Sequence, residues 1–173
     1  GWVRIIDFAL LYVMLALGNP LHAFDYDKIG RDKNRAAIVV RSARAGEQLT
    51  TLDGKTRALL DTDLVIADAE RAIAIAGVMG GADTEVGVGT TRVLLECAHF
   101  APARVRRTAR RLALHSEASH RFERGADPNG VPASLDRAAA LIAERAGGSA
   151  TYGRQRLLDR VPAKFHERCP LFI

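Results

Sequence analysis

Histidine, serine and glutamate side chains are concentrated in the stretch HSEASH, residues 115–120. Side chains of these types can bind a metal ion or take part in acid–base and nucleophilic catalysis. His115 and His120 flank Glu117, but their spacing is not the i, i+4 spacing of a helical HExxH zinc motif. A zinc deaminase would also carry a downstream PCxxC motif, which this sequence lacks. We therefore expect no metal site here.

The serines of the same stretch are weak candidates for a nucleophile. Ser116 and Ser119 lie near histidines in the sequence, but no GxSxG motif surrounds them. Serines in polar segments usually form local hydrogen bonds or cap a helix. The stretch is then either a polar turn beside a basic helix or part of a nucleic-acid contact.

A basic segment precedes this stretch. A helix is predicted over residues 103–114, because Pro102 can occupy its first turn and apolar residues recur at helical spacing. Arginine suits bidentate phosphate recognition, so the segment is a candidate RNA contact. The alternative is a solvated face whose arginines pair with Glu117 or Glu123. The candidate arginines are Arg104, Arg106, Arg107, Arg110, Arg111, Arg121 and Arg124.

Glu96 ends the apolar run RVLLE, residues 92–96. This position predicts a carboxyl group held at a strand end and partly buried, where it needs a polar partner. A salt bridge to an arginine would supply one. The alternative is that Glu96 recognises a hydroxyl group of a ligand.

Composition places the chain among ordinary globular proteins. It has 173 residues and a net charge of +5, which only weakly favours a polyanionic partner. Cys97 and Cys169 show no CxxC spacing, which argues against a thiolate zinc site and a disulfide framework and favours reduced thiols in the cytoplasm. The apolar run 8–17 is too short to span a bilayer, so we expect a buried helix and no membrane association.

The remaining elements are read from apolar pattern and turn signals. Strands are predicted at 36–43, 63–68, 71–81 and 91–98, with a hairpin over 48–59 that turns at Asp53-Gly54. A turn or short helix is expected near residues 20–29. A helix that Asp127 could cap and Gly147 ends would bury Leu135, Ala138, Ala139 and Ile142. Residues 150–158 suggest a final strand, and 159–173 look irregular.

Serial hairpins with helices at both ends predict an α+β fold with a largely antiparallel, curved sheet or small barrel. No dinucleotide-binding fingerprint or P-loop is present in the sequence. We expect one domain over residues 1–173.

Several motifs, in this order, resemble the editing-domain region of the bacterial phenylalanyl-tRNA synthetase β subunit. They are YVMLALGNPLHAFDYDKI, VVRSARAGEQLTTLDG, DLVIAD, AIAGVMGG, TEV and LLECAHFAPARVRRTARRLALHSEASHRFERGADP. The resemblance is best over residues 12–148 and poor over 1–11. It implies an antiparallel, barrel-like β core decorated with helices, and a pocket that hydrolyses tyrosine wrongly attached to phenylalanine-specific tRNA.

The resemblance also implies which residues form that pocket. Glu96 would accept the phenolic proton of tyrosine, and His22 would orient an attacking water. Gly77 and Ala118 would leave room for the ring, and Ser116 would complete the wall. At Leu10 and Leu11 the family typically has Thr-Asn, which contributes polar groups to the pocket. We therefore expect the isolated chain to be weak or inactive in this hydrolysis.

The same resemblance sets the expected partners. They are phenylalanine-specific tRNA, the synthetase α subunit and the remaining β-subunit domains, in the cytoplasm. No cofactor is expected in this domain, because ATP and Mg²⁺ would serve a synthetic site elsewhere in the parent enzyme. Two further functions stay open: a non-catalytic RNA-binding or subunit-assembly module, and an independent metal hydrolase, which the residue pattern supports poorly.

Overall fold

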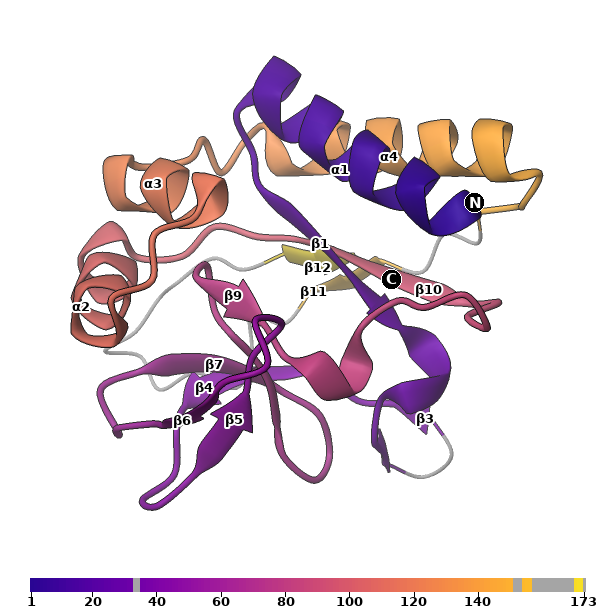
Figure 1. Ribbon diagram of the computed structural model, residues 1–173. Coiled ribbons are helices and arrows are strands. Elements are labelled where there is room, and N and C mark those ends of the chain that lie inside the picture. Colours follow the sequence, from indigo (N-terminus) through magenta and orange to yellow (C-terminus); the bar gives the residue numbers. More distant parts are fainter. Residues whose placement is uncertain (33–34, 151–153, 157–169, 173) are drawn as a thin grey trace.

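Four α-helices flank the strands in the computed structural model, which describes residues 1–32, 35–150, 154–156 and 170–172 (Figure 1). Helices α1 and α4 lie side by side, and α2 and α3 form a second packed pair at one end of the molecule. The bounds are α1 Trp2–Leu17, α2 Pro102–Leu112, α3 Glu117–Arg124 and α4 Val131–Ala146, with short 3-10 helices η1 Tyr26–Lys28 and η2 Ala82–Thr84.

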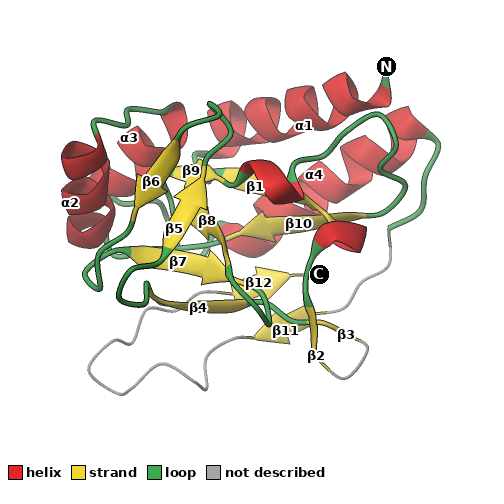
Figure 2. Ribbon diagram, turned by 60° about the horizontal axis from the view of Figure 1, so that its bottom comes forward, coloured by secondary structure: helices red, strands yellow, loops and turns green. Residues whose placement is uncertain are grey.

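The strands form small antiparallel sheets. The largest sheet has the order β4-β7-β8-β9, and two-stranded sheets pair β1 with β10, β5 with β6, β2 with β3, and β11 with β12 (Figure 2). The bounds are β1 Leu21–Asp25, β2 Arg31–Asp32, β3 Arg35–Ala36, β4 Val39–Ser42, β5 Gln48–Thr50, β6 Thr56–Ala58, β7 Leu64–Ala67, β8 Ala72–Ile75, β9 Met79–Gly80, β10 Val93–Cys97, β11 Arg154–Arg156 and β12 Pro170–Phe172.

The mixed, antiparallel character predicted from the sequence is confirmed. All strand pairs in the described part of the chain are antiparallel. No sheet among these residues closes on itself, so the barrel-like core is not confirmed. An isolated bridge between Thr51 and Gly81 joins the β5–β6 hairpin to the end of β9.

The core lies mainly between the four-stranded sheet, β10 and helices α2 and α3. Strands β7 and β8 are buried along their whole length, as their continuous apolar sequence indicates. The aromatic rings of Phe24 and Phe100 are fully buried in this core. Strand β10 thus connects the core to the ribbon that it forms with β1, and helices α1 and α4 cover that ribbon.

Helix α1 is longer and less buried than predicted. It begins at Trp2 rather than residue 8, and only Ile6, Ala9, Val13 and Met14 are buried. The opposite face leaves Phe8 66% exposed, because α4 covers one side of the helix only. The predicted end is confirmed, since Gly18 adopts the left-handed conformation with φ 83°.

Two predictions for the first half of the chain differ from the structure. The short helix expected near residues 20–29 is present only as η1, whereas residues 21–25 form strand β1, because they pair with β10, a distant partner that local pattern does not reveal. The strand predicted over residues 71–81 is two strands, β8 and β9, because Gly77 with φ 71° turns the chain between them. The hairpin turn at Asp53-Gly54 is confirmed, with Gly54 at φ 76°.

The helices after β10 also differ in detail from the prediction. HSEASH is not a turn: Ser116 caps helix α3, which begins at Glu117. Helix α4 begins after Gly130, and the Asp127 carboxylate instead accepts a hydrogen bond from the backbone N–H of Asn129. Of the predicted buried stripe of α4, Leu135 and Ala138 are buried, whereas Ala139 and Ile142 are only partly buried.

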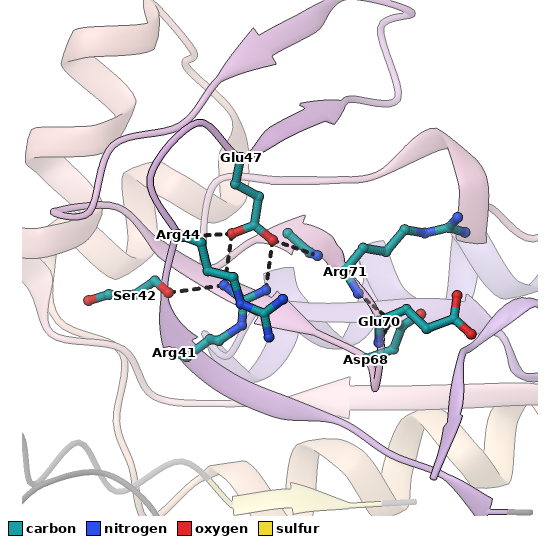
Figure 3. Close-up of polar contacts among 8 residues, drawn as sticks. Arg41, Ser42, Arg44, Glu47, Asp68, Glu70 and Arg71 are labelled. Atoms are coloured by element: carbon teal, nitrogen blue, oxygen red, sulfur yellow. Dashed lines mark hydrogen bonds and ion pairs between the residues drawn. The ribbon is translucent and has the colours of Figure 1, made fainter.

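The connection between β4 and β5 is tied to the β7–β8 turn by Glu47 (Figure 3). Its carboxylate accepts two hydrogen bonds from Arg41, at 2.8 and 2.7 Å, and one from the backbone N–H of Ala72 at 3.0 Å. The Arg41 guanidinium lowers the pKa of Glu47 to about 2. Asp68 organises the turn itself by accepting hydrogen bonds from the backbone N–H groups of Glu70 and Arg71.

The C-terminal segment is described only in part. Strand β11 lies in the predicted 150–158 strand, and β12 lies within residues 159–173, which the sequence analysis treated as irregular. The other residues of both segments, including Cys169, lie outside the described residues. No helix in the described ranges combines the length and apolar composition needed to cross a bilayer.

Candidate functional site

A cavity of about 460 Å³ lies between the β1–β10 ribbon, the turn that links β8 to β9, and the start of α3. Its wall is mostly apolar, with Phe100 and Phe122 among the lining residues. All five residues that the family resemblance implies for a pocket line it, although they are scattered through the chain. They are His22, Gly77, Glu96, Ser116 and Ala118.

The polar centre of the cavity is the pair His22 and Glu96. These residues are directly opposite each other in the antiparallel ribbon of β1 and β10. Opposite residues in such a pair have Cβ atoms about 4.5–5.5 Å apart and share one face. One small group of a ligand could therefore contact both side chains.

Burial sets the charge state of Glu96. The residue is only 5% exposed, and burial raises the pKa of its carboxyl group to about 8. Near neutral pH this carboxyl group is mostly protonated, so it can both donate and accept a hydrogen bond. The salt bridge to an arginine that the sequence left open is not among the ion pairs of the described residues.

His22 offers an unused polar atom. Its Nε2 is buried and has no hydrogen-bond partner among the described residues. Burial lowers the pKa of the imidazole to about 4, so the ring is neutral near pH 7. The ring packs edge-on against Phe24, with the centroids 4.5 Å apart, and lies against the backbone of Gly80.

The packing around Gly77 gives a second reason for a glycine at this position, beside the expected room for a ring, which stays a prediction. A Cβ atom at this position would lie 3.0 Å from side-chain carbons of Phe122 and Val105, and the φ of 71° is strained for other residues. The absent side chain thus serves the turn and the close approach of α2 and α3. Ala118 lies near the start of α3, is partly buried and also packs against the core.

Both hydrogen-bonding roles of the Ser116 hydroxyl are in use. It accepts a hydrogen bond from the backbone N–H of Ser119 at 3.0 Å and donates one to the carbonyl of Val78 at 3.1 Å. Ser116 therefore fixes α3 against the β8–β9 turn and is poorly placed to act as a nucleophile.

A second depression, also about 460 Å³, lies on the outer side of the same helix start. His115, Glu117 and His120 contribute to its wall, together with Arg121. In the described ranges no group of three or more His, Cys, Asp or Glu side chains is arranged to hold a metal ion. We favour the inner cavity as the functional site, because its two ionisable groups are buried and its shape is set by packed elements.

The structure divides the candidate arginines by their contacts. Arg111 pairs with the buried Asp63, and Arg121 pairs with Glu117 at 2.6 Å. Three others donate hydrogen bonds to protein groups: Arg104 to Ser42 and Thr62, Arg106 to the Glu123 carbonyl, and Arg124 to the His120 carbonyl. Arg107 and Arg110 are exposed, and no hydrogen bond or ion pair joins them to other described residues.

Comparison with known proteins identifies the family. The B3/4 domain model matches residues 8–147, most of the chain. The chain belongs to the B3/4 domain family.

Relatives of this B3/4 domain carry the name phenylalanine–tRNA ligase beta subunit. One from Anaeromyxobacter dehalogenans is 61% identical over 150 residues, covering 87% of this chain and 18% of that protein. One from Moorella thermoacetica is 56% identical over 143 residues, covering 83% and 17%. One from Geobacter metallireducens is 53% identical over 142 residues, covering 82% and 17%. The chain spans less than a fifth of the length of these curated relatives.

Leu10 and Leu11 stand where the family resemblance implies polar residues of the pocket, so their position in this B3/4 domain matters. Both lie on helix α1, where Leu10 is partly buried and Leu11 is 47% exposed. Neither is among the described residues that line the cavity. Weak or absent hydrolysis by the isolated chain stays a prediction, but the geometry gives it no support from these two positions.

Sequence reasoning missed Gly80, which is essential to the shape of the site. A Cβ atom there would lie 2.5 Å from His22 Cε1. Leu52 and Asp53 of the β5–β6 hairpin also line the cavity and were read only as hairpin residues. The glycine doublet in VMGG was the available signal, since adjacent glycines often mark close approach to the backbone.

Proposed function

We propose that this B3/4 domain is the editing module of a phenylalanine–tRNA ligase beta subunit. It would hydrolyse the ester of tyrosine attached in error to phenylalanine-specific tRNA. The supporting observation is that His22, Gly77, Glu96, Ser116 and Ala118 surround one mostly apolar cavity with a buried carboxyl group. An aromatic ring suits the apolar wall, and a phenolic hydroxyl suits Glu96.

Tyrosine is distinguished from phenylalanine by one hydroxyl group. A site built to bind a hydroxyl can reject the analogue that lacks it by about 10⁴–10⁵-fold, because buried polar groups are otherwise left unpaired. Glu96 and His22 are opposite each other in the β1–β10 ribbon and both line the cavity, and Nε2 of His22 has no partner among the described residues, so we assign both to binding the phenol. Phenylalanine would leave both without a partner.

Hydrolysis needs an attacking water but no protein nucleophile. The water oxygen bonds to the ester carbonyl carbon, the bond to the ribose oxygen breaks, and that oxygen takes up a proton. Tyrosine and tRNA are released. His22 is a weak base, because its pKa is lowered to about 4, so we assign it to orienting the water or the phenol rather than to removing a proton.

The deciding experiment measures tyrosine release from tyrosyl-tRNA specific for phenylalanine, with phenylalanyl-tRNA as the control. The 173-residue chain should release tyrosine and leave phenylalanine attached. Glu96→Ala should lose the preference for tyrosine. His22→Ala should slow the release of both amino acids if it orients water, or reduce only the preference if it binds the phenol. Equal, uncatalysed release from both substrates would refute the proposal.

Filling the cavity gives an independent test. Ala118→Trp should abolish tyrosine release, because the indole occupies the space that we assign to the substrate ring. The melting temperature should stay close to that of the parent chain, since Ala118 is only partly buried. Undiminished release from this variant would place the substrate elsewhere.

A second candidate function is a non-catalytic RNA-binding or subunit-assembly module of the same ligase. The basic helix α2 favours it, because RNA binding there needs no hydrolysis. Binding of tRNA without tyrosine release would identify this function. In both cases we propose phenylalanine-specific tRNA, the α subunit and the remaining β-subunit domains as partners, a cytoplasmic location, and no cofactor in this domain.

A further inference from the structure

Helix α2 carries a one-sided charge. Residues 102–112 include five arginines and no aspartate or glutamate. Three of these arginines have structural partners: Arg104 bonds to Ser42 and Thr62, Arg106 to the Glu123 carbonyl, and Arg111 to Asp63. Arg107 and Arg110 remain exposed, without such partners among the described residues.

These two arginines are neighbours on the helix surface. Residues three apart in an α-helix have Cβ atoms about 5–6 Å apart, and like charges at this spacing repel each other. The pair therefore gives the isolated helix no stability through mutual contact. A doubly charged surface of this kind is favourable where an anion lies against it, and guanidinium groups match phosphate oxygens in a bidentate geometry.

The buried side of α2 packs against residues that line the cavity. No residue of α2 is among the described lining residues, but Phe100 before the helix and Ser116 after it are. Val105, on the buried face, lies against the Cα of Gly77. The exposed arginines thus lie on the outer surface of an element that packs beside the proposed ester site.

We propose that Arg107 and Arg110 bind phosphates near the aminoacylated 3′ end of the tRNA. This inference rests on the proposed function, because an amino acid held in the cavity brings the adjoining nucleotides close to α2. Arg104, Arg106, Arg111, Arg121 and Arg124 then serve the protein structure. The proposal reduces the seven candidate RNA contacts to two.

The test is the salt dependence of tRNA binding by the 173-residue chain, measured by fluorescence anisotropy. The phenylalanine-specific tRNA carries tyrosine through an amide in place of the ester, so that the amino acid can occupy the cavity and hydrolysis does not alter the signal. Each phosphate contact contributes about 0.7–0.9 to the slope of log Kobs against log salt concentration. The slope is negative, and the double variant Arg107→Ala/Arg110→Ala should reduce its magnitude by about 1.4–1.8.

Arg137→Ala is the matched control. Arg137 is exposed on α4 and forms no hydrogen bond or ion pair with the described residues. Its replacement removes one positive charge, so the two variants are compared per arginine. The slope of this control should equal that of the parent chain. An unchanged slope in the double variant, or an equal decrease per arginine in the control, would overturn the proposal. The second outcome would show that only net charge matters.

Tyrosine release at saturating tRNA separates this inference from the proposed function. An arginine-dependent slope without any tyrosine release would uphold the phosphate surface and refute editing. Tyrosine release with an unchanged slope would uphold editing and refute the phosphate surface. Affinity of Arg107 and Arg110 for an acidic protein surface, with tRNA binding unaffected, would also overturn it.

Discussion

At the scale of single residues, Glu96 and His22 owe their chemistry to burial. A glutamate on the surface is ionised near neutral pH, whereas the pKa of Glu96 is raised to about 8. The pKa of His22 is lowered to about 4 for the same reason. Both groups are thus mostly neutral around pH 7, so the mostly apolar cavity carries polar groups without a net charge.

The first prediction concerns stability and pH. Glu96 favours folding most below its ordinary pKa of 4.5, and this stabilisation is lost as the pH rises toward about 8. His22 acts in the opposite direction: its contribution is present above 6.5 and is lost as the pH falls toward about 4. The two effects oppose each other where the two pH ranges overlap, from pH 4.5 to 6.5. Above pH 6.5 only the Glu96 effect changes the free energy of unfolding.

Urea unfolding between pH 6.5 and 8 measures this directly. The free energy of unfolding should fall by at most about 1.4 kcal/mol per pH unit in the parent chain. Glu96→Gln removes the ionisable group, so its unfolding free energy should be nearly constant over this range. Parallel pH dependence of the two chains would contradict the burial of an ionisable Glu96.

The second prediction concerns Gly80. Alanine at this position would place Cβ 2.5 Å from His22 Cε1 and 2.7 Å from Nε2, so the imidazole must move. We expect Gly80→Ala to shift the NMR signals of the His22 ring and to slow tyrosine release. Gly87→Ala is the control, because nothing lies within 4 Å of its added Cβ. Identical ring signals in the parent and Gly80→Ala would show that the backbone does not position His22.

At the scale of elements, helix α2 presents different side chains on its two sides. Its buried side holds Val105, Thr108 and Ala109 against the core. Thr108 donates a hydrogen bond to Asp63 at 2.9 Å, and Arg111 pairs with the same carboxylate. The outer side carries Arg107 and Arg110. Consecutive residues such as Arg110 and Arg111 therefore have different surroundings.

The third prediction compares these two neighbours. Arg111→Ala leaves the Asp63 carboxylate, only 2% exposed, without its cation, and should lower the free energy of unfolding by about 2–4 kcal/mol. Arg110→Ala should change it by less than about 0.5 kcal/mol, because the side chain is exposed. Chemical denaturation of both variants checks this. Equal destabilisation would mean that the Asp63 pair contributes little.

At the scale of the whole molecule, the N-terminal and C-terminal helices are joined through Asn19. This fully buried side chain donates a hydrogen bond to the Asp127 carbonyl at 2.7 Å and accepts one from the Ser134 hydroxyl at 3.2 Å. It follows the end of α1 and contacts the start of α4. The pair of helices in turn covers the ribbon that carries His22 and Glu96.

The fourth prediction follows from this link. Asn19→Ala leaves buried polar groups unpaired and should cost about 1–3 kcal/mol of stability. Amide hydrogen exchange should become faster in α4. Asn129→Ala is the control, because Asn129 is exposed and only its backbone N–H forms a hydrogen bond among the described residues. Unchanged exchange in α4 would show that apolar packing alone holds the helices together.

The sequence predicted the elements whose signals are local. The Asp53-Gly54 turn, the Gly18 helix end and helix α2 are set by residues within a few positions of one another. Helix α3 was missed because its capping box uses Ser119 where a glutamate or glutamine is usual. Its start therefore lacks the usual sequence signature.

By itself, the sequence determined an antiparallel α+β protein with a basic helix, and its motifs indicated the family. Only the tertiary structure decided that His22 lies opposite Glu96, that Gly77 adjoins Val105 and Phe122, and which arginines are already paired. The physical reason is that burial, pKa and ion pairing depend on residues distant in the chain. Periodicity and turn chemistry describe near neighbours and carry no information about those contacts.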